Sequence, residues 1–309
     1  MNILEPTDEN IALAADALRR GLLVAMPTET VYGVAADATN REAVRKVFDL
    51  KGRPPENPLI VHVATFEQVL PLVREVPPLA RVLADRFWPG PLTLVLPKSD
   101  LVPPEVTAGL DTVAIRMPKH PVALSLILAA GTPLAAPSAN PFTQLSPTRA
   151  EHIDPELAKG IAHVLDGGPC FVGLESTVVD LTMNPPAILR PGGVSRGDIQ
   201  AALGVPLGQI PSAKMRTSPG MYPRHYAPRV PVRLVECVPP EAAGLVLGPA
   251  SNALQIRMPR DAVAYACALY DALHRLDQQE PTTIYVERPE GGPEWEAVVD
   301  RLVKASTPG

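Results

Sequence analysis

The chain has 309 residues, of which 46% are hydrophobic, and a formal net charge of −5. This size and hydrophobicity are sufficient for a sizeable core in one large domain or in two, and the acidity argues against a protein dedicated to coating nucleic acid. No apolar run approaches the roughly 20 residues that span a bilayer, and the acidic N-terminal segment predicts no signal peptide and a cytoplasmic location.

Residues 1–205 alternate helical patterns with short apolar runs. Apolar side chains from Ile11 to Leu18 share a helical face, and an apolar run at 22–26 predicts a strand. Asn40 and Gly52 are suited to begin and end a second helix. Further strands are expected at 59–63, 92–96, 113–117, 134–136, 161–165 and 177–181, and further helices at 78–87, 121–129 and 195–203. The alternation predicts one α/β domain with a mixed twisted sheet.

Residues 206–231 differ from what precedes them, because they hold six prolines and no acid. This composition predicts a proline-rich linker. Tyr222 and Tyr226 offer large groups for docking, so we expect the linker to fold back as a lid over the first domain. Residues 232–309 then repeat the alternation, with strands expected at 245–247 and 283–286 and helices at 262–277 and 294–305. They predict a small Rossmann-like α/β domain without a constellation of chemical groups.

The segment PTETVYGVAAD, residues 27–37, follows a predicted strand directly. Open α/β sheets usually place ligands where a strand runs into a loop. Thr28, Glu29 and Thr30 cluster two hydroxyls and a carboxylate at this point. The alternative interpretation is an ordinary capped turn.

The segment KGRPPENPLIVHV, residues 51–63, contains two cations beside a helix-ending glycine. Lys51 and Arg53 suit a polyphosphate, and we expect both to be partly exposed. Asn57 offers a donor and an acceptor, and alternation aims His62 away from its two valine neighbours. The alternative is a solvated basic loop and a hydrogen-bonded core histidine.

Four further segments place a polar side chain beside an apolar strand: APSAN with SPT, VAIRMP, ESTVVD and LRPGGV. Ser138 and Ser146 can donate to phosphate or ribose oxygens, although turns around prolines would also explain them. Ser176 and Arg190 are the polar groups of ESTVVD and LRPGGV. Arg116 lies in an apolar strand, so it requires a buried anion, which is either a ligand or a structural Asp or Glu.

Several common signatures are missing from the sequence. The chain has neither a P-loop, G-x-x-x-x-G-K-[ST], nor a G-x-G-x-x-G fingerprint, and it has no G-x-S-x-G nucleophile motif. Its cysteines, Cys170, Cys237 and Cys267, lie far apart, which predicts reduced thiols and no metal site in the protein.

Taken together, the ordered segments PTETVYG, KGRPPENPLIVHV, VAIRMP, APSAN with SPT, ESTVVD and LRPGGV resemble the YrdC-like threonylcarbamoyl-AMP synthases. The linker segment SPGMYPRHYAP, followed by a small domain, resembles the long form of that family. The resemblance implies a YrdC-like catalytic domain at 1–205, a linker or lid at 206–231 and a C-terminal domain at 232–309.

The resemblance also implies the roles of individual residues. Threonine contacts fall on Thr30, His62, Arg116, Ala136 and Ser176. ATP contacts fall on Arg53, Asn57, Thr112, Ser138, Ser146, Arg190 and Tyr226. Lys51 is our added candidate for phosphate binding, and Lys51 and Arg53 are the expected catalytic cations.

The implied reaction joins L-threonine, bicarbonate and ATP into threonylcarbamoyl-AMP, with Mg²⁺ carried by the ATP phosphates. The product would pass to the machinery that modifies tRNA next to the anticodon, with at most a weak contact to tRNA itself. One rival is a carbamoyl transferase of related fold, which would carry CxxC zinc fingers that this chain lacks. The other rival is a non-catalytic RNA-binding module, which would not need the hydroxyls of Thr30, Ser138 and Ser176.

Overall fold

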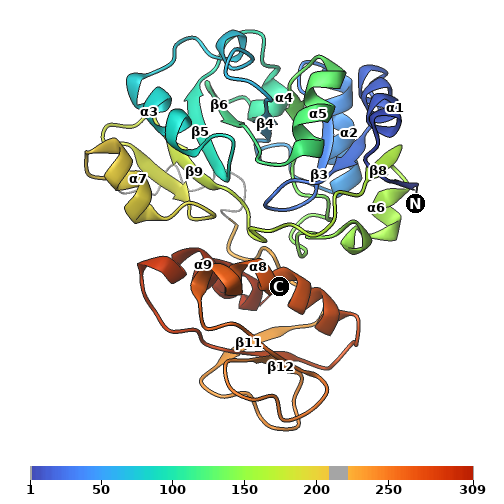
Figure 1. The fold of residues 1–309 in the computed structure, drawn as a ribbon, viewed down its shortest axis with the longest axis vertical. Coiled ribbons are helices and arrows are strands. Elements are labelled where there is room, and N and C mark those ends of the chain that lie inside the picture. Colours follow the sequence, from blue (N-terminus) through green and yellow to red (C-terminus); the bar gives the residue numbers. More distant parts are fainter. Residues whose placement is uncertain (1, 209–221, 309) are drawn as a thin grey trace.

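The computed structural model describes residues 2–208 and 222–308, which form a larger body and a smaller one packed against it (Figure 1). The larger body contains a ten-stranded sheet with helices on both faces, and the smaller contains a four-stranded sheet. In the part of the chain that is described, no helix combines the length and apolarity needed to cross a bilayer.

The ten-stranded sheet is mixed, as the sequence predicts. Its order is β1 (Ile3–Leu4), β8 (His163–Leu165), β2 (Val24–Met26), β3 (Gly33–Asp37), β7 (Leu134–Ala135), β4 (Ile60–His62), β6 (Thr112–Arg116), β5 (Leu92–Pro97), β9 (Thr177–Asp180) and β10 (Ala187–Arg190). Strand pairs β1–β8, β2–β8, β4–β6 and β5–β9 are parallel, and the other pairs are antiparallel.

The helices of this body are α1 (Asp8–Arg19), α2 (Arg41–Lys51), α3 (Pro78–Phe87), α4 (Pro104–Thr107), α5 (Pro121–Ala130), α6 (Pro155–Ala158) and α7 (Arg196–Leu203). Helix α2 begins and ends as its sequence predicts: the side chain of Asn40 accepts from two backbone N–H groups, and Gly52 adopts a left-handed φ of 60°. Strand alternation divides the core, because Ala25 packs with α2 on one face while Met26 packs with α1 and α5 on the other.

The smaller body has an all-parallel sheet in the order β11 (Val232–Val235), β14 (Ile284–Glu287), β12 (Gly244–Val246) and β13 (Gln255–Arg257). Helices α8 (Ala262–Asp277) and α9 (Glu296–Ser306) lie between this sheet and the larger body (Figure 1). The result is the second α/β domain that the sequence predicts.

The two bodies share one apolar cluster. Val31, Leu145 and Leu174 from the larger body pack with Tyr226 and with the buried faces of α8 and α9. Half-exposed ion pairs flank this cluster, including Arg196 with Glu296 at 2.8 Å. The interface therefore places α8 and α9 directly beneath the loops that follow the strands of the large sheet.

Most expected elements appear within about two residues of their predicted bounds, but the prediction missed several strands. Strand β3 lies inside the segment PTETVYGVAAD, where the sequence predicts a loop. Its backbone pairs antiparallel to β2, so residues 27–32 form a tight connection between adjacent strands. Strands β1, β11 and β13 were also missed.

Candidate functional site

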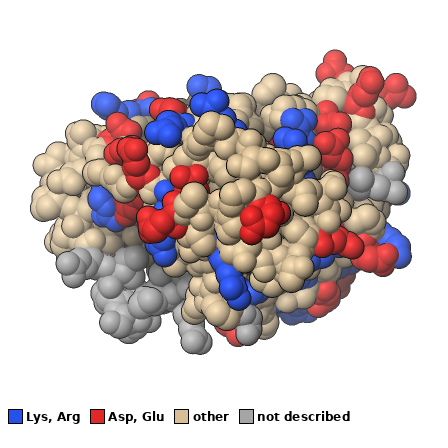
Figure 2. Space-filling model, turned by 90° about the horizontal axis from the view of Figure 1, so that it is seen from below, with Lys and Arg blue, Asp and Glu red and all other residues tan. Residues whose placement is uncertain are grey.

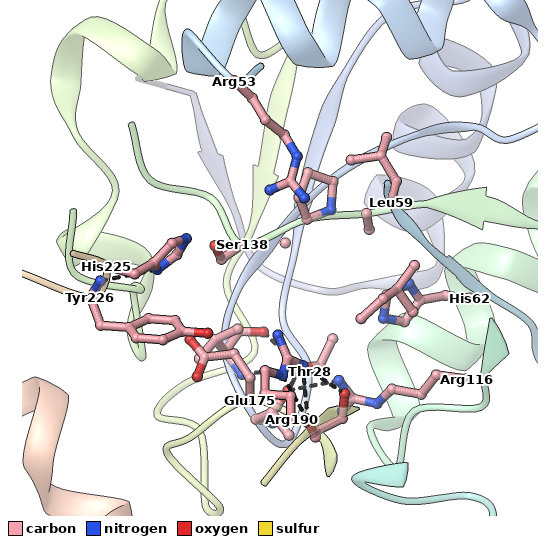
Figure 3. Close-up of a pocket in the computed structure, with 17 residues that line it drawn as sticks. Thr28, Arg53, Leu59, His62, Arg116, Ser138, Glu175, Arg190, His225 and Tyr226 are labelled. Atoms are coloured by element: carbon pink, nitrogen blue, oxygen red, sulfur yellow. Dashed lines mark hydrogen bonds between the residues drawn. The ribbon is translucent and has the colours of Figure 1, made fainter. Parts of the chain in front are cut away.

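One pocket collects most of the residues singled out in the sequence. It is formed by the loops and strand ends of the larger body and is closed on one side by His225 and Tyr226. In the close-up, Arg53 projects into the pocket from the side opposite Glu175 and Arg190 (Figure 3). His62 and Arg116 lie across the pocket from His225 and Tyr226. The pocket is thus lined by cations, hydroxyls and aromatic rings from segments that are far apart in the sequence.

Arg116, at the end of β6, is held by groups from two loops. Its Nη1 donates to the Thr30 hydroxyl at 2.9 Å, and its Nε donates to the Gly90 carbonyl at 3.3 Å. Its Nη2 lies 2.7 Å from Oε1 of Glu29, an ion pair that is not aligned as a hydrogen bond. Of the two partners proposed from the sequence, a protein carboxylate is therefore present, and both side chains are buried.

Thr28 organises the loop that carries Thr30. Its hydroxyl donates to the Val31 carbonyl at 2.6 Å and lies 2.9 Å from the Thr30 hydroxyl. It also accepts from the backbone N–H groups of Thr30 and Val31. The capped turn is therefore real, and it presents Thr28 and Thr30 to the pocket.

Ser176 lies where β9 begins, between Thr93 and Arg190. Its hydroxyl is 2.7 Å from the Thr93 hydroxyl and accepts from Arg190 Nη2 at 3.1 Å. Arg190 also donates twice to the Ser176 carbonyl, at 2.8 and 3.1 Å. This arrangement fixes a hydroxyl and a guanidinium side by side on the pocket wall.

His62 projects from β4 into the pocket while Val61 and Val63 pack into the core, as alternation predicts. Burial, followed by the nearby charge of Arg116, lowers the pKa of His62 to about 3. The imidazole is therefore neutral at physiological pH and can serve as a hydrogen-bonding group without adding charge.

Arg53 lines the pocket, but Lys51 does not. The guanidinium of Arg53 donates to the carbonyls of Asn57 at 3.0 Å and Pro58 at 2.8 Å. The Lys51 ammonium donates to the carbonyls of Ser138, at 2.5 Å, and Asn140. The expectation that both cations are partly exposed is wrong, because their exposed fractions are 3% for Lys51 and 7% for Arg53.

Burial affects the two cations in the same direction. It lowers the pKa of Arg53 to about 9 and that of Lys51 well below its usual value, and the neighbouring guanidinium of Arg53 depresses the Lys51 value further. The Phe142 N–H donates to the Lys51 carbonyl at 2.9 Å, so the loop of residues 140–142 covers this helix end. The glycine after the helix suggested an open end, and tertiary packing closes it.

The predicted site residues divide into those that line the pocket and those that stand behind it. The lining residues are Thr30, His62, Arg116, Ala136, Ser176, Arg53, Ser138, Arg190 and Tyr226. Lys51, Asn57, Thr112 and Ser146 do not line it. The buried side-chain amide of Asn57 has no partner among the described residues, Thr112 is half-buried at the start of β6, and Ser146 donates to Glu175 Oε1 at 2.6 Å.

Sequence reasoning missed Glu175 and His225, which also line the pocket. Burial alone would raise the pKa of Glu175, but Arg301, Arg190 and the Ser146 hydrogen bond outweigh it and hold the pKa at about 2. Glu175 is therefore ionised at neutral pH. Its position in ESTVVD, one residue before Ser176, was the only sequence signal available.

His225 and Tyr226 close the pocket from the described end of the linker. Burial lowers the pKa of His225 to about 3, so this ring is also neutral. Tyr226 adopts a left-handed φ of 58°, and its ring stacks on Tyr270 with centroids 6.1 Å apart. Its buried hydroxyl has no hydrogen-bond partner among the described residues. The expected lid also includes residues 209–221, which lie outside the described residues.

Two protein-family models together match most of the chain. The Sua5/YciO/YrdC family model, described as "Telomere recombination", matches residues 16–192. The model for the threonylcarbamoyl-AMP synthase C-terminal domain matches residues 194–307. The threonylcarbamoyl-AMP synthase of Bacillus subtilis is 42% identical over 98% of this chain and 94% of its own. That of Pyrococcus abyssi is 49% identical over 76% of this chain and 71% of its own.

Two solved structures are also similar to this chain. The crystal structure of Pyrococcus abyssi Sua5 complexed with L-threonine has a TM-score of 0.86 and 40% identity, covering 99% of this chain and 96% of that one. Escherichia coli YciO has a TM-score of 0.55 and 22% identity over 62% of this chain and 94% of its own, and it shares the fold of the larger body.

Proposed function

The chain belongs to the threonylcarbamoyl-AMP synthase family, and from this premise we infer that it is an L-threonylcarbamoyladenylate synthase. It would join L-threonine, bicarbonate and the adenylyl group of ATP and release pyrophosphate. The observation that carries the inference is a single pocket in which His62 and Arg116, with Thr30 hydrogen-bonded to Arg116, face one part of the cavity and Arg53 another.

We assign threonine to the part of the pocket lined by Thr30, His62, Arg116, Ala136 and Ser176. Arg116 is already paired with Glu29, so it brings a fixed and neutralised guanidinium to the amino acid. The hydroxyls of Thr30 and Ser176 and the neutral imidazole of His62 supply short-range hydrogen bonds. These groups suit an amino acid that carries its own hydroxyl.

We assign ATP to the lining residues Arg53, Ser138, Arg190 and Tyr226, and we assign Asn57, Thr112 and Ser146, which do not line the pocket, a supporting role behind them. The Tyr226 hydroxyl and the Asn57 amide have no hydrogen-bond partner among the described residues, which supports this assignment because buried polar groups normally have one. Arg53 lines the pocket, and we assign it to the phosphates. Lys51 is assigned an indirect role: it fixes the backbone of Ser138 and Asn140 around the nucleotide.

The chemistry follows from the substrates. The threonine amine attacks the carbon of dissolved CO2, or that of bicarbonate with loss of water, and gives up a proton to form a carbamate. A carbamate oxygen then attacks the α-phosphorus of ATP, the bond from that phosphorus to the bridging oxygen breaks, and pyrophosphate leaves. The protein positions the reactants and neutralises the developing charge with Arg53 and Arg190. Mg²⁺ enters bound to the ATP phosphates, as part of the substrate.

The proposed domain organisation has three parts: a catalytic domain at 1–205, a linker at 206–231 and a C-terminal domain at 232–309. His225 and Tyr226 line the pocket, and Tyr222 packs edge-on against Phe142. We assign the linker the role of a lid that shields the labile product from water. Opening would admit substrates and release product.

We further propose that the product passes, in the cytoplasm, to an enzyme that transfers the threonylcarbamoyl group to tRNA. Seen from the side of the smaller body, the acidic and basic side chains of the described residues are interspersed and form no broad basic patch (Figure 2). Any contact of this face with tRNA would therefore be weak, because tight RNA binding usually requires clustered cations.

Pyrophosphate release tests the proposed function. The purified chain should release pyrophosphate from ATP when L-threonine and bicarbonate are both present, and omission of either should abolish release. Equal release without threonine would identify an ATP hydrolase and reject the proposal.

A further inference from the structure

We propose that Arg301, in the C-terminal domain, is a positioning residue for the nucleotide part of the pocket. It would act by orienting Glu175 and the ring of Tyr226, and through them the ATP contacts of the catalytic domain. The proposal rests on the proposed function, and it gives the second domain a direct part in building the site.

Arg301 projects from α9 and is wholly buried. Its Nε donates to Glu175 Oε2 at 2.8 Å, and its Nη2 donates to the Pro191 carbonyl at 2.9 Å. Its Nη1 donates to Asp300 at 2.5 Å. The guanidinium carbon also lies 4.7 Å from the centre of the Tyr226 ring, a cation–π contact. A single side chain thus contacts the β9 entry loop, the loop after β10 and the linker.

Glu175 extends these contacts into the pocket. Its Oε1 accepts from the Ser146 hydroxyl, and the hydroxyl of Tyr270 on α8 approaches Oε2 at 3.1 Å. The next residue is Ser176, whose carbonyl and hydroxyl hold Arg190. Arg301 therefore contacts Tyr226 directly and reaches Ser146 and the Ser176–Arg190 pair through Glu175. We assign these residues to the ATP and threonine sites.

Stability alone is a poor explanation for this ion pair. Replacing a buried ion pair by apolar groups is often neutral or stabilising, whereas removing one partner is strongly destabilising. The same interface also contains Arg196–Glu296, a half-exposed pair that does not reach the pocket in question. The planar fork of Arg301 instead fixes direction, since it donates to a carboxylate and a carbonyl at once.

The test compares Arg301→Met and Arg301→Lys with the matched control Arg196→Met. ATP and threonine affinities are measured separately by calorimetry, and turnover by pyrophosphate release. Arg301→Met should weaken ATP binding by roughly 10–100-fold, the cost of a charge-assisted contact, and should change threonine binding much less. Arg301→Lys keeps the charge but not the fork, so it should recover only part of the ATP affinity. Arg196→Met should leave both affinities unchanged.

A second comparison distinguishes positioning from general destabilisation. In Arg301→Met, Glu175 still faces Arg190 of β10, Ser146, Tyr270 of α8 and Tyr226, but it loses the guanidinium of Arg301. The double variant Arg301→Met with Glu175→Gln removes the stranded charge. It should regain melting temperature while ATP binding stays weak. It also keeps the test decisive if the single variant does not fold.

Two results would overturn the proposal: unchanged ATP affinity in the folded double variant, or equal losses of ATP and threonine affinity that the double variant reverses together with stability. If the wild-type chain binds ATP but releases no pyrophosphate with threonine and bicarbonate, the proposed function fails. The calorimetric comparison of ATP binding still tests Arg301 in that case.

Discussion

The guanidinium of Arg116 and the carboxylate of Glu29 lie 2.7 Å apart, and both are buried beside the proposed threonine site. The pair explains how an arginine is accommodated at the end of an apolar strand. It also means that the amino acid meets a guanidinium whose charge is already balanced. Geometry, more than net charge, should then determine the contribution of Arg116 to threonine binding.

We predict that Arg116→Lys weakens threonine binding measurably, because lysine cannot contact Glu29, Thr30 and Gly90 together. ATP binding should change less. Calorimetric titration of each substrate measures both effects. Unchanged threonine affinity would show that the pair is purely structural.

Glu29→Gln should destabilise the fold by about 3–5 kcal/mol, the usual cost of leaving a buried charge without its partner. Urea unfolding measures this loss. The control is Asp85→Asn, which breaks the Arg81–Asp85 pair, where both side chains are 58% exposed. That change should cost at most about 1 kcal/mol. A loss in Glu29→Gln as small as in the control would contradict the assigned role of the pair.

Substitutions of Lys51 and Arg53, the two cations of the basic segment, should have different effects. Arg53→Lys should weaken ATP binding, because Arg53 lines the pocket and its fork is held by Asn57 and Pro58. Lys51→Met should mainly lower the melting temperature, because the ammonium donates to two buried carbonyls. Thermal unfolding together with ATP calorimetry distinguishes them. The reverse pattern would make Lys51 the phosphate ligand.

Stability should fall as the solution is acidified below about pH 6.5. Burial lowers the pKa of His62 and His225 to about 3 and that of His152 to about 4. Below pH 6.5 the unfolded chain binds protons that the folded chain excludes, so each histidine costs up to about 1.4 kcal/mol per pH unit, down to its folded pKa. Glu175 stays ionised over this window.

Urea midpoints measured across this window test the slope. His152→Asn provides the comparison, because His152 stacks on His274 at the domain interface, with ring centroids 4.1 Å apart, and does not line the pocket. The stability of the His152→Asn variant should depend less steeply on pH than that of the wild-type chain. A wild-type stability that is constant between about pH 7.5 and 5 would rule out buried neutral histidines.

Cutting the chain after Val205 should leave a folded domain with poorer activity. The truncation removes Tyr226 and Arg301 and uncovers Val31, Leu145 and Leu174. Tyr226→Ala in the full chain should cause part of the same loss.

With ATP and threonine bound, amides in Tyr222–Pro228 should exchange more slowly with solvent. Equal exchange with and without ligands would reject the lid.

The sequence predicts local features well where one short segment determines them. The cap at Asn40, the left-handed Gly52 and the direction of His62 depend on neighbouring residues, and all three appear as expected. Strand β3 was missed because its residues closely follow the polar residues Thr28, Glu29 and Thr30, so the whole segment resembles a polar loop. The exposure of Lys51 was misjudged because the loop that covers it comes from residues 140–142.

The long-range contacts of the site left no local signal. Glu175 and Arg301 are separated by 126 residues, and neither lies in a pattern that indicates the other. The sequence predicts that Arg116 pairs with either a ligand or a protein carboxylate. The three-dimensional structure is needed to identify Glu29 as that carboxylate. Pairings of this kind depend on how the two bodies pack, which single-sequence patterns do not specify.

The most direct test of the central claim is to identify the product. The chain is incubated with ATP, L-threonine and ¹³C-labelled bicarbonate, and the reaction is analysed by mass spectrometry. The account predicts threonylcarbamoyl-AMP, heavier than the unlabelled compound by one neutron mass, formed together with pyrophosphate and absent when threonine is omitted. ADP and phosphate as the only products, or an adenylate without the label, would contradict it.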